Sequence, residues 1–238
     1  MRHPIILAVC MAGVTALAGC GEKDANATVE RAFKDVNVVD ETNLVADPNE
    51  AVSYFARSVK ESPDRIDHQR GLAASLVRAK RSTEAVGAWD KVTKMKGATP
   101  EDSVQLADAL IRSGNWARAE TVLNSIPPTH ETFARYRLEA MVADSKEQWS
   151  RADSFYEIAV GLTTTPAAVM NNWGYSKLTR GDYPEAERLF GEAIRQDNTL
   201  FTAKNNLIMA RAAQRDYTLP VMPMEQSERA QLLHTMAL

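Results

Sequence analysis

The chain has few of the residues from which catalytic and metal sites are usually built. Two of its 238 residues are cysteines, Cys10 and Cys20, and four are histidines. Because both cysteines lie near the amino terminus, the rest of the chain has no thiol for a disulfide, a cysteine zinc site or a cysteine nucleophile. The histidines lack the spacing of metal ligands, and no glycine-rich phosphate loop or nucleophile elbow is present. We therefore expect no catalytic residue, no cofactor and no metal, and predict that the protein is not an enzyme.

Basic residues are not in excess either. The chain has 28 Lys and Arg against 31 Asp and Glu, which gives a formal net charge of −3. Proteins that bind nucleic acid neutralise its phosphates with a basic surface, so we expect no nucleic-acid partner. Apolar residues make up 45% and charged residues 25%, the ordinary balance of a soluble folded protein.

The first twenty residues have the pattern of a targeting segment. Residues 4–18 carry no charge, but they are too few to cross a bilayer, which takes about 20 apolar residues. The stretch is followed by Cys20, and the sequence Leu-Ala-Gly-Cys at residues 17–20 resembles a bacterial lipobox. That resemblance implies a signal peptide of residues 1–19 and lipidation of Cys20, followed by a tether over residues 20–46. The alternative is an ordinary secretory signal that contains a cysteine.

The rest of the chain repeats at intervals of about 34 residues. Successive blocks begin at Ala32, Ile66, Pro100, Phe133, Ala167 and Phe201. The twentieth place of the first five blocks is always alanine: Ala51, Ala85, Ala119, Ala152 and Ala186. The twenty-fourth place is always large and apolar: Phe55, Trp89, Leu123, Tyr156 and Phe190. The eighth place of the middle blocks is small: Ala73, Ala107, Ala140 and Gly174.

This pattern resembles the tetratricopeptide repeat, in which each unit is a pair of antiparallel helices. Two helices approach closely only where their crossing point carries small side chains, and a bulky residue one turn later fills the gap to the next helix. The resemblance implies an all-α solenoid of antiparallel helix pairs, which we place at residues 47–216. The first block keeps only its second helix, and the last block keeps only its first.

Local signals support these helix boundaries. Asp47 precedes a proline and is predicted to cap a helix, and Asp182 with Glu185 is predicted to form a capping box. The pair Pro127-Pro128 is predicted to end a helix early. The four tryptophans occupy core or turn positions of the repeat, so we predict that they are packing residues.

The last residues of the chain, 217–238, depart from the repeat. Prolines interrupt the first part of this segment, and an amphipathic helix is predicted from about Glu225 to the end, with Leu232, Leu233, Met236 and Ala237 on one face. We expect this helix to cover the exposed end of the solenoid, because a terminal repeat needs a cap.

In tetratricopeptide solenoids the first helices of successive units line a concave face, so polar residues on that face are candidates for binding a partner. We predict a partner-binding groove from residues at these places: Arg70, Arg78, Asp108, Arg112, Arg137, Asn171, Asn172, Tyr175, Asn205 and Asn206. Asparagine amides can pair with the backbone of an extended peptide, and arginines with its carboxylates. Solvated helix surface is the alternative interpretation of each residue. A lysine and asparagine clamp for a terminal carboxylate is only partly present and is not predicted.

The layout as a whole resembles the TadD family, the tetratricopeptide-repeat lipoproteins of Tad (Flp) pilus assembly. The resemblance is carried by the tail, Tyr-Thr-Leu-Pro-Val-Met-Pro-Met at residues 217–224, and by Asn-Asn-Leu at residues 205–207. It implies a scaffold that binds the pilus secretin or another Tad component. The resemblance to bacterial lipoproteins also implies, from Gly21 after Cys20, a location at the outer membrane, on its periplasmic face. The alternatives are a pilotin or scaffold of another envelope assembly system, and a regulator of a cell-wall enzyme or a cryptic hydrolase.

Overall fold

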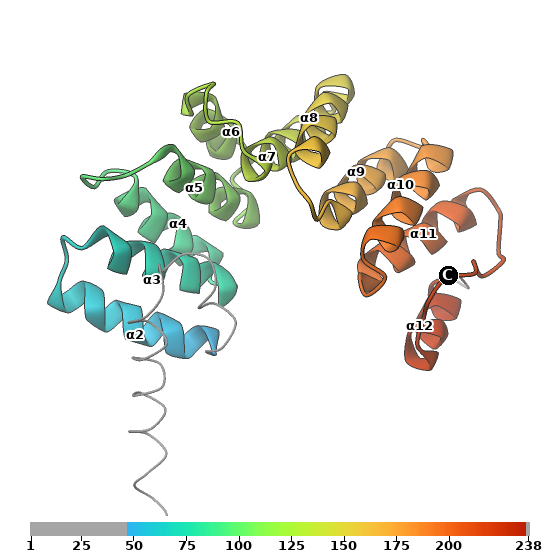
Figure 1. The fold of residues 1–238 in the computed structure, drawn as a ribbon, viewed down its shortest axis with the longest axis horizontal. Helices are drawn as coiled ribbons and strands as arrows, with labels where there is room; N and C mark the ends of the chain where they lie inside the picture. Colours follow the sequence, from blue (N-terminus) through green and yellow to red (C-terminus); the bar gives the residue numbers. More distant parts are fainter. Residues whose placement is uncertain (1–46, 237–238) are drawn as a thin grey trace, which may run out of the picture. The chain divides into compact units, whose positions relative to one another are not determined.

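The computed structural model describes residues 47–236, all of whose regular structure is helical (Figure 1). The predicted signal peptide, the lipidation site at Cys20 and the tether lie outside these described residues, as do residues 237 and 238. The described chain divides into two compact parts, residues 47–80 and residues 81–236. The all-α prediction is confirmed for the described residues.

The first part is a pair of helices, α2 (Pro48–Glu61) and α3 (Ile66–Arg78), joined by a short connection. Asp47 begins α2 as predicted, because its Oδ1 accepts hydrogen bonds from the backbone N–H groups of Asn49, at 2.8 Å, and Glu50. The two helices approach closely where the ring of Phe55 lies against Gly71. A Cβ atom added to Gly71 would lie 2.3 Å from that ring, so only glycine fits the crossing.

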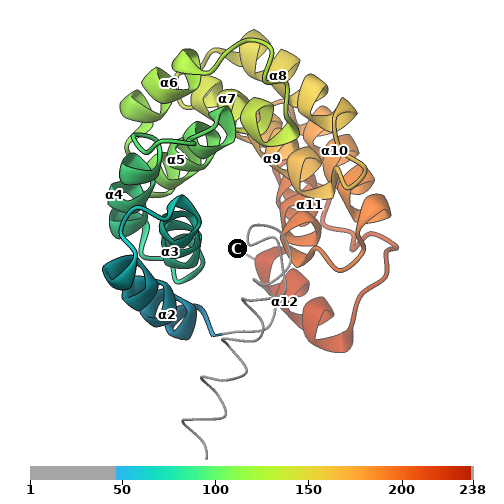
Figure 2. The ribbon, with the colours of Figure 1, turned by 60° about the vertical axis from the view of Figure 1, so that its left-hand side comes forward.

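The second part contains the remaining helices, and their bounds follow the predicted repeat. They are α4 (Ser82–Val92), α5 (Pro100–Arg112), α6 (Trp116–Ser125), α7 (Phe133–Asp144), α8 (Trp149–Gly161), α9 (Ala167–Thr179), α10 (Tyr183–Gln196), α11 (Phe201–Ala213) and α12 (Gln226–Met236). The helices α5, α7, α9 and α11 begin at the residues predicted to open their blocks. Figure 2 shows these first helices on the inner side of the second part, with α4, α6, α8 and α10 outside them.

The core of the second part forms at the repeat positions that the sequence marks. The alanines at the twentieth place are completely buried: Ala85, Ala119, Ala152 and Ala186. The large residues four places later are buried beside them, including Tyr156 and Phe190. Phe190 of α10 packs over Gly174 of α9, where an added Cβ would lie 2.7 Å from the ring. Small residues therefore set the helix spacing and large ones fill it, as predicted.

The turn after each first helix contains a residue with a left-handed backbone. The fifteenth place of the last four blocks has a positive φ: Gly114 (80°), Glu147 (56°), Gly181 (84°) and Arg215 (61°). Only two of these are glycine, the residue that adopts this conformation without steric penalty. The repeat geometry therefore imposes the turn on Glu147 and Arg215 against their local preference.

Two local predictions about helix ends had different outcomes. Helix α6 ends at Ser125, two residues before Pro127, so the early stop is confirmed. The capping box at the start of α10 is wrong, because Asp182 accepts no capping hydrogen bond. Glu185 instead pairs with Arg188 one turn later, and Asp182 lies 3.6 Å from the ammonium group of Lys177. The carboxylates of Asp182 and Glu185 therefore pair with nearby cations and not with the backbone N–H groups at the start of α10.

The carboxy-terminal helix α12 packs on α11. Leu232 is completely buried, but Leu233 is 46% exposed, so the prediction that both lie on one packed face is wrong. Polar groups of α11 add to the contact that Leu232 makes. The ammonium group of Lys204, almost completely buried, lies 2.8 Å from Glu228, and the Thr235 hydroxyl donates to the amide oxygen of Asn205 at 2.8 Å.

Candidate functional site

The predicted groove residues of the first part are Arg70 and Arg78, both on α3. Arg70 is half-buried, with its guanidinium 3.6 Å from the carboxylate of Asp67, and Arg78 is also half-buried. Both therefore belong to the surface of the α2–α3 pair. The other predicted groove residues lie in the second part.

Three of them form one charged cluster. Asp108 of α5 accepts a hydrogen bond from Arg112 one turn later on the same helix, and another from Arg137 of α7 at 3.0 Å. Arg137 also lies 3.8 Å from the sulfur of Met141, through its other terminal nitrogen. The two arginines therefore share an internal carboxylate, which leaves the cluster with one positive charge in excess. The Arg137 side chain is mostly buried among these partners, whereas the Arg112 side chain is 50% exposed.

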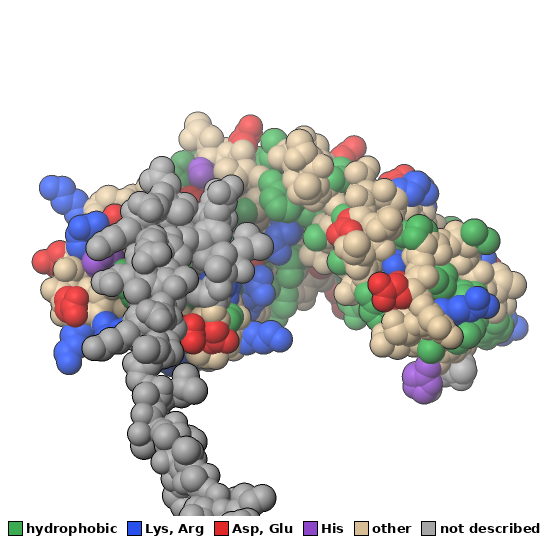
Figure 3. Space-filling model, turned by 60° about the horizontal axis from the view of Figure 1, so that its bottom comes forward, with side chains coloured by type: hydrophobic (Ala, Val, Ile, Leu, Met, Phe, Trp, Pro, Cys, Tyr) green, Lys and Arg blue, Asp and Glu red, His purple; other side chains and the backbone are tan. Residues whose placement is uncertain are grey.

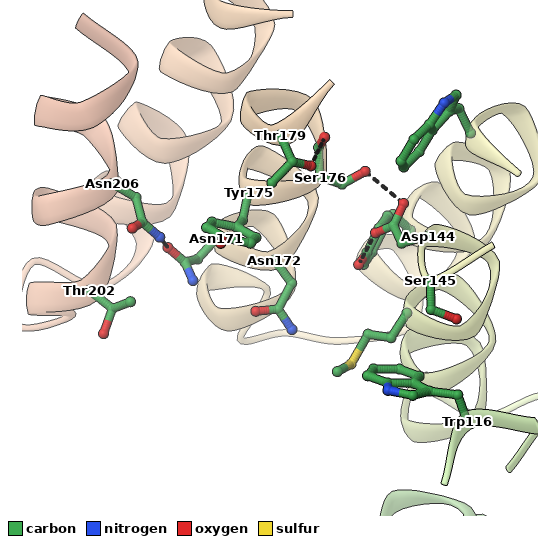
Figure 4. A pocket seen from close by; sticks show the side chains of 13 residues that line it. Trp116, Asp144, Ser145, Asn171, Asn172, Tyr175, Ser176, Thr179, Thr202 and Asn206 are labelled. Carbon is green, nitrogen blue, oxygen red and sulfur yellow. Dashed lines mark hydrogen bonds between the residues drawn. The ribbon is translucent and has the colours of Figure 1, made fainter. Parts of the chain in front are cut away.

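A cavity of about 500 Å³ lies beside this cluster, on the inner side of the second part. Five helices contribute to its walls, and Figure 4 shows the side chains that face it. It is lined by Trp116, Met141, Asp144, Ser145, Trp149, Tyr156, Asn171, Asn172, Tyr175, Ser176, Thr179, Thr202 and Asn206. Four of the predicted groove residues are therefore brought together here: Asn171, Asn172, Tyr175 and Asn206.

The carboxyl group in the wall is fully engaged. The Tyr156 hydroxyl donates to one oxygen of Asp144 at 2.8 Å, and the Ser176 hydroxyl donates to the other at 2.7 Å (Figure 4). Burial raises the pKa of Asp144, although the two hydrogen bonds act in the opposite direction. Burial also raises the pKa of Tyr156, and the neighbouring Asp144 adds to that effect. These two hydrogen bonds therefore fix the Asp144 carboxyl group in the wall of the cavity.

A second network holds the α8–α9 side of the wall. Asp153 of α8 accepts hydrogen bonds from the indole N–H of Trp173 at 2.6 Å, from Lys177 of α9, and from Arg180, which directly follows α9. Burial by itself would raise the pKa of Asp153, but the hydrogen bonds from Arg180, Trp173 and Lys177 outweigh it and lower the pKa. The guanidinium of Arg180 also lies over the ring of Trp149, 5.6 Å from its centre. The contact with Arg180 fixes the orientation of Trp149, which lines the cavity.

The asparagines of α9 and α11 differ in their environment. Asn206 donates from its side-chain nitrogen to the side-chain oxygen of Asn171 at 3.0 Å, and both residues are buried. Asn172 is half-buried at the cavity, and Tyr175 is 51% exposed. Among the described residues, no hydrogen-bond partner engages the side chain of Asn172, Tyr175 or Thr202. The cavity therefore presents an unpaired amide and two unpaired hydroxyl groups.

Sequence and structure comparisons identify the repeat. Residues 171–219 match the sequence family described as "Tetratricopeptide repeat". The fold resembles that of Cut9–Hcn1, an APC/C hetero-tetramer, with a TM-score of 0.70 and 15% identity over 91% of this chain and 44% of that chain. The chain has the fold of a tetratricopeptide-repeat solenoid.

Two further proteins are similar to this chain, one in fold and one in sequence. Its fold is similar to that of PilW, described as a widely conserved type IV pilus biogenesis factor, with a TM-score of 0.66 and 12% identity over 90% of each chain. In sequence, 145 residues are 24% identical to stress-induced-phosphoprotein 1 of Caenorhabditis elegans. That match covers 60% of this chain and 45% of the relative, so the chain spans less than half the length of the relative.

The solenoid also shows which cavity residues the sequence prediction missed. Trp116 and Trp149 were predicted to be packing residues, but both line the cavity. They share one repeat position, the first residue of a second helix, and that common position is the signal that could have identified them. Asn205 was predicted in the groove, but it does not line the cavity, and its oxygen is engaged by Thr235 of α12.

The described part of the solenoid gives no sign of two other kinds of site. Over residues 47–236, no group of three His, Asp or Glu side chains lies close enough to hold a metal ion. Within the same range, no helix has both the length and the apolar character that crossing a membrane requires.

Proposed function

We propose that this protein is a non-enzymatic scaffold that binds a segment of a protein partner in the cavity of its second part. The observation that carries this proposal is the set of unpaired polar groups of Asn172, Tyr175 and Thr202, placed on consecutive first helices around an apolar hollow. A pocket with apolar walls and a few polar groups is the usual form of a recognition site. Helix-pair repeats expose such a site along successive units.

We further propose that the scaffold acts in the bacterial envelope, anchored by lipid on Cys20 to the periplasmic face of the outer membrane. This part rests on the lipobox at residues 17–20 and on the TadD-like tail at residues 217–224. PilW, whose fold is similar, is itself described as a pilus biogenesis factor. The proposed partner is accordingly the pilus secretin or another component of Tad pilus assembly.

Anchoring gives the scaffold a physical advantage. A protein held by a short tether stays within the tether's reach of the membrane, so it meets a membrane-embedded partner at a high effective concentration. Moderate affinity in the cavity is then sufficient for assembly. Such a scaffold needs recognition and proximity, and it needs no catalytic group.

Affinity purification from native membranes tests the proposal. The tagged full chain is compared with a double variant, Asn172→Ala with Tyr175→Ala, and the proteins that co-purify are identified by mass spectrometry. We expect the secretin or another Tad component with the parent chain, and its depletion with the double variant. Recovery of only outer-membrane assembly factors or cell-wall enzymes would contradict the pilus assignment. Equal recovery of every partner by the double variant would contradict binding in the cavity.

A further inference from the structure

One repeat position changes character along the inner face of the second part. The ninth place of successive first helices is Asp108 on α5, Met141 on α7, Tyr175 on α9 and Met209 on α11. The charged cluster is therefore followed by a row of large, mostly apolar side chains. Tyr175 and Met209 are both among the exposed large apolar residues of the described chain. This row continues past the cavity, to which Met141 and Tyr175 contribute.

Polar side chains lie beside this row at regular intervals. Arg137 is four residues before Met141 and lies 3.8 Å from its sulfur, and Asn205 stands in the same relation to Met209 at 3.7 Å. The equivalent residue before Tyr175 is Asn171, which is bonded to Asn206. Asn172, next to Asn171, is the amide of this set without a partner among the described residues. An amide both donates and accepts, so it can pair with the N–H and C=O groups of an extended backbone.

The charge of the cavity determines what it can accept. Its lining contains no Lys, Arg or His. Its carboxyl group, Asp144, has both oxygens occupied by hydroxyl donors. On the face shown in Figure 3, Lys and Arg side chains are interspersed with Asp and Glu side chains rather than gathered in one patch. A ligand carboxylate would lose its water in this cavity and find no cationic side chain to pair with, which is unfavourable.

The walls are suited to one large apolar side chain. Trp116, Trp149 and Tyr156 bring aromatic rings to the cavity, and Met141 adds a flexible thioether. Methionine adapts its shape to different ligands and packs favourably against aromatic rings. The volume of about 500 Å³ exceeds what one side chain fills and leaves room for the backbone on either side of it.

We propose that the cavity binds an extended segment of a protein partner that lacks acidic residues and inserts one large aromatic or aliphatic side chain between the aromatic walls. The Asn172 amide pairs with the backbone of that segment, and the hydroxyl and ring of Tyr175 cover its exposed edge. Met209 continues the apolar surface for the next residues of the segment. This inference rests on the proposed function, and it adds the chemistry of the ligand. It also excludes an acidic segment or a free terminal carboxylate as the ligand of this cavity.

A peptide selection tests the inference directly. The full chain is immobilised and probed with a displayed library of random linear peptides, and enriched sequences are synthesised with acetylated and amidated ends. Binding is then followed by tryptophan fluorescence, because Trp116 and Trp149 line the cavity. We expect enriched peptides to carry a Phe, Trp, Leu or Met within a stretch that lacks Asp and Glu.

Matched variants assign the binding to the cavity. Asn172→Ala and Tyr175→Ala should each weaken binding of an enriched peptide about ten-fold or more. Asn124→Ala on α6 and Tyr217→Ala in the tail change the same residue types at exposed positions elsewhere, and they should leave binding unchanged. Replacing the large apolar residue of the peptide by Asp should abolish binding.

The possible results separate this inference from the proposed function. Enriched peptides that carry acidic residues, or that need a free carboxylate, would overturn the inference and leave the partner-binding scaffold standing. Peptides that bind the two cavity variants as tightly as the parent chain would overturn it as well. A selection that enriches no peptide at all would overturn the inference and would also count against partner binding through a linear segment.

Discussion

The left-handed turns of the repeat predict how the free energy of unfolding changes when glycine is removed from a turn or introduced into one. Gly181 has a φ of 84°, and a Cβ added there would meet no atom within 4 Å. A change to alanine therefore introduces backbone strain and no steric contact. That strain costs about 1–2 kcal/mol, and alanine recovers about 0.4–1 kcal/mol by restricting the unfolded chain. We expect Gly181→Ala to lower the free energy of unfolding by about 1 kcal/mol.

Glu147 provides the reverse change. Its φ is 56°, its side chain is exposed, and no side-chain interaction with another described residue holds it. Glycine at this position removes the same strain at the expense of greater freedom in the unfolded chain. We expect Glu147→Gly to raise the free energy of unfolding by about 0.5–1 kcal/mol. Gly87, an exposed residue inside α4 with open space around it, is the control. Because it has an ordinary helical backbone, Gly87→Ala should stabilise by about 0.5–1 kcal/mol.

Urea unfolding of the three variants, followed by helical circular dichroism, measures these changes. In a thermal scan, a change of 1 kcal/mol in a domain of this size corresponds to about 2–4 °C. The reasoning requires opposite signs for the two glycine-to-alanine changes. If Gly181→Ala were as stabilising as Gly87→Ala, the left-handed turn would not impose strain. A destabilising Glu147→Gly would show that the Glu147 side chain contributes more than the structure indicates.

Three further predictions concern a buried acid, the last helix and the anchor. Burial raises the folded-state pKa of Asp144 above its ordinary value of 3.8, so its ionisation removes stability as the pH rises through that folded pKa. Asp144→Asn should therefore gain stability relative to the parent chain between pH 4 and neutrality, as measured by urea unfolding at a series of pH values. Lys204→Met removes the buried partner of Glu228, so limited proteolysis should cut the tail faster, whereas Glu225→Gln should leave the rate unchanged. Cys20→Ser should release the folded protein from the membrane fraction. Normal processing and retention of that variant in the membrane would contradict the lipoprotein proposal.

The repeat was predictable from the sequence because its determinants are local and recur. A small residue is needed wherever two helices cross, so the alanines at the twentieth place fix the register of every unit. The structure begins α5, α7, α9 and α11 at the predicted residues for this reason. The positive φ of Glu147 was not predictable in the same way, because nothing in a glutamate indicates a left-handed turn.

The candidate site was predictable only in part, because its geometry depends on pairs from different units. Asn171, Asn172, Tyr175 and Asn206 were placed on the inner face by their repeat position alone, and the cavity gathers them. Arg137 was predicted in the partner-binding groove, and it pairs with Asp108 of the preceding unit, a contact that no single repeat contains.

Photo-crosslinking from inside the cavity tests the central claim most directly. A photoreactive amino acid replaces Tyr175, which is half-exposed at the cavity, or Ile158, which is similarly exposed on α8 and does not line it. After illumination of intact cells, crosslinked proteins are purified and identified. The account predicts a specific crosslink to one envelope protein from position 175 and none to that protein from position 158. Crosslinking of the same protein from position 158 alone, or equally from both positions, would contradict it.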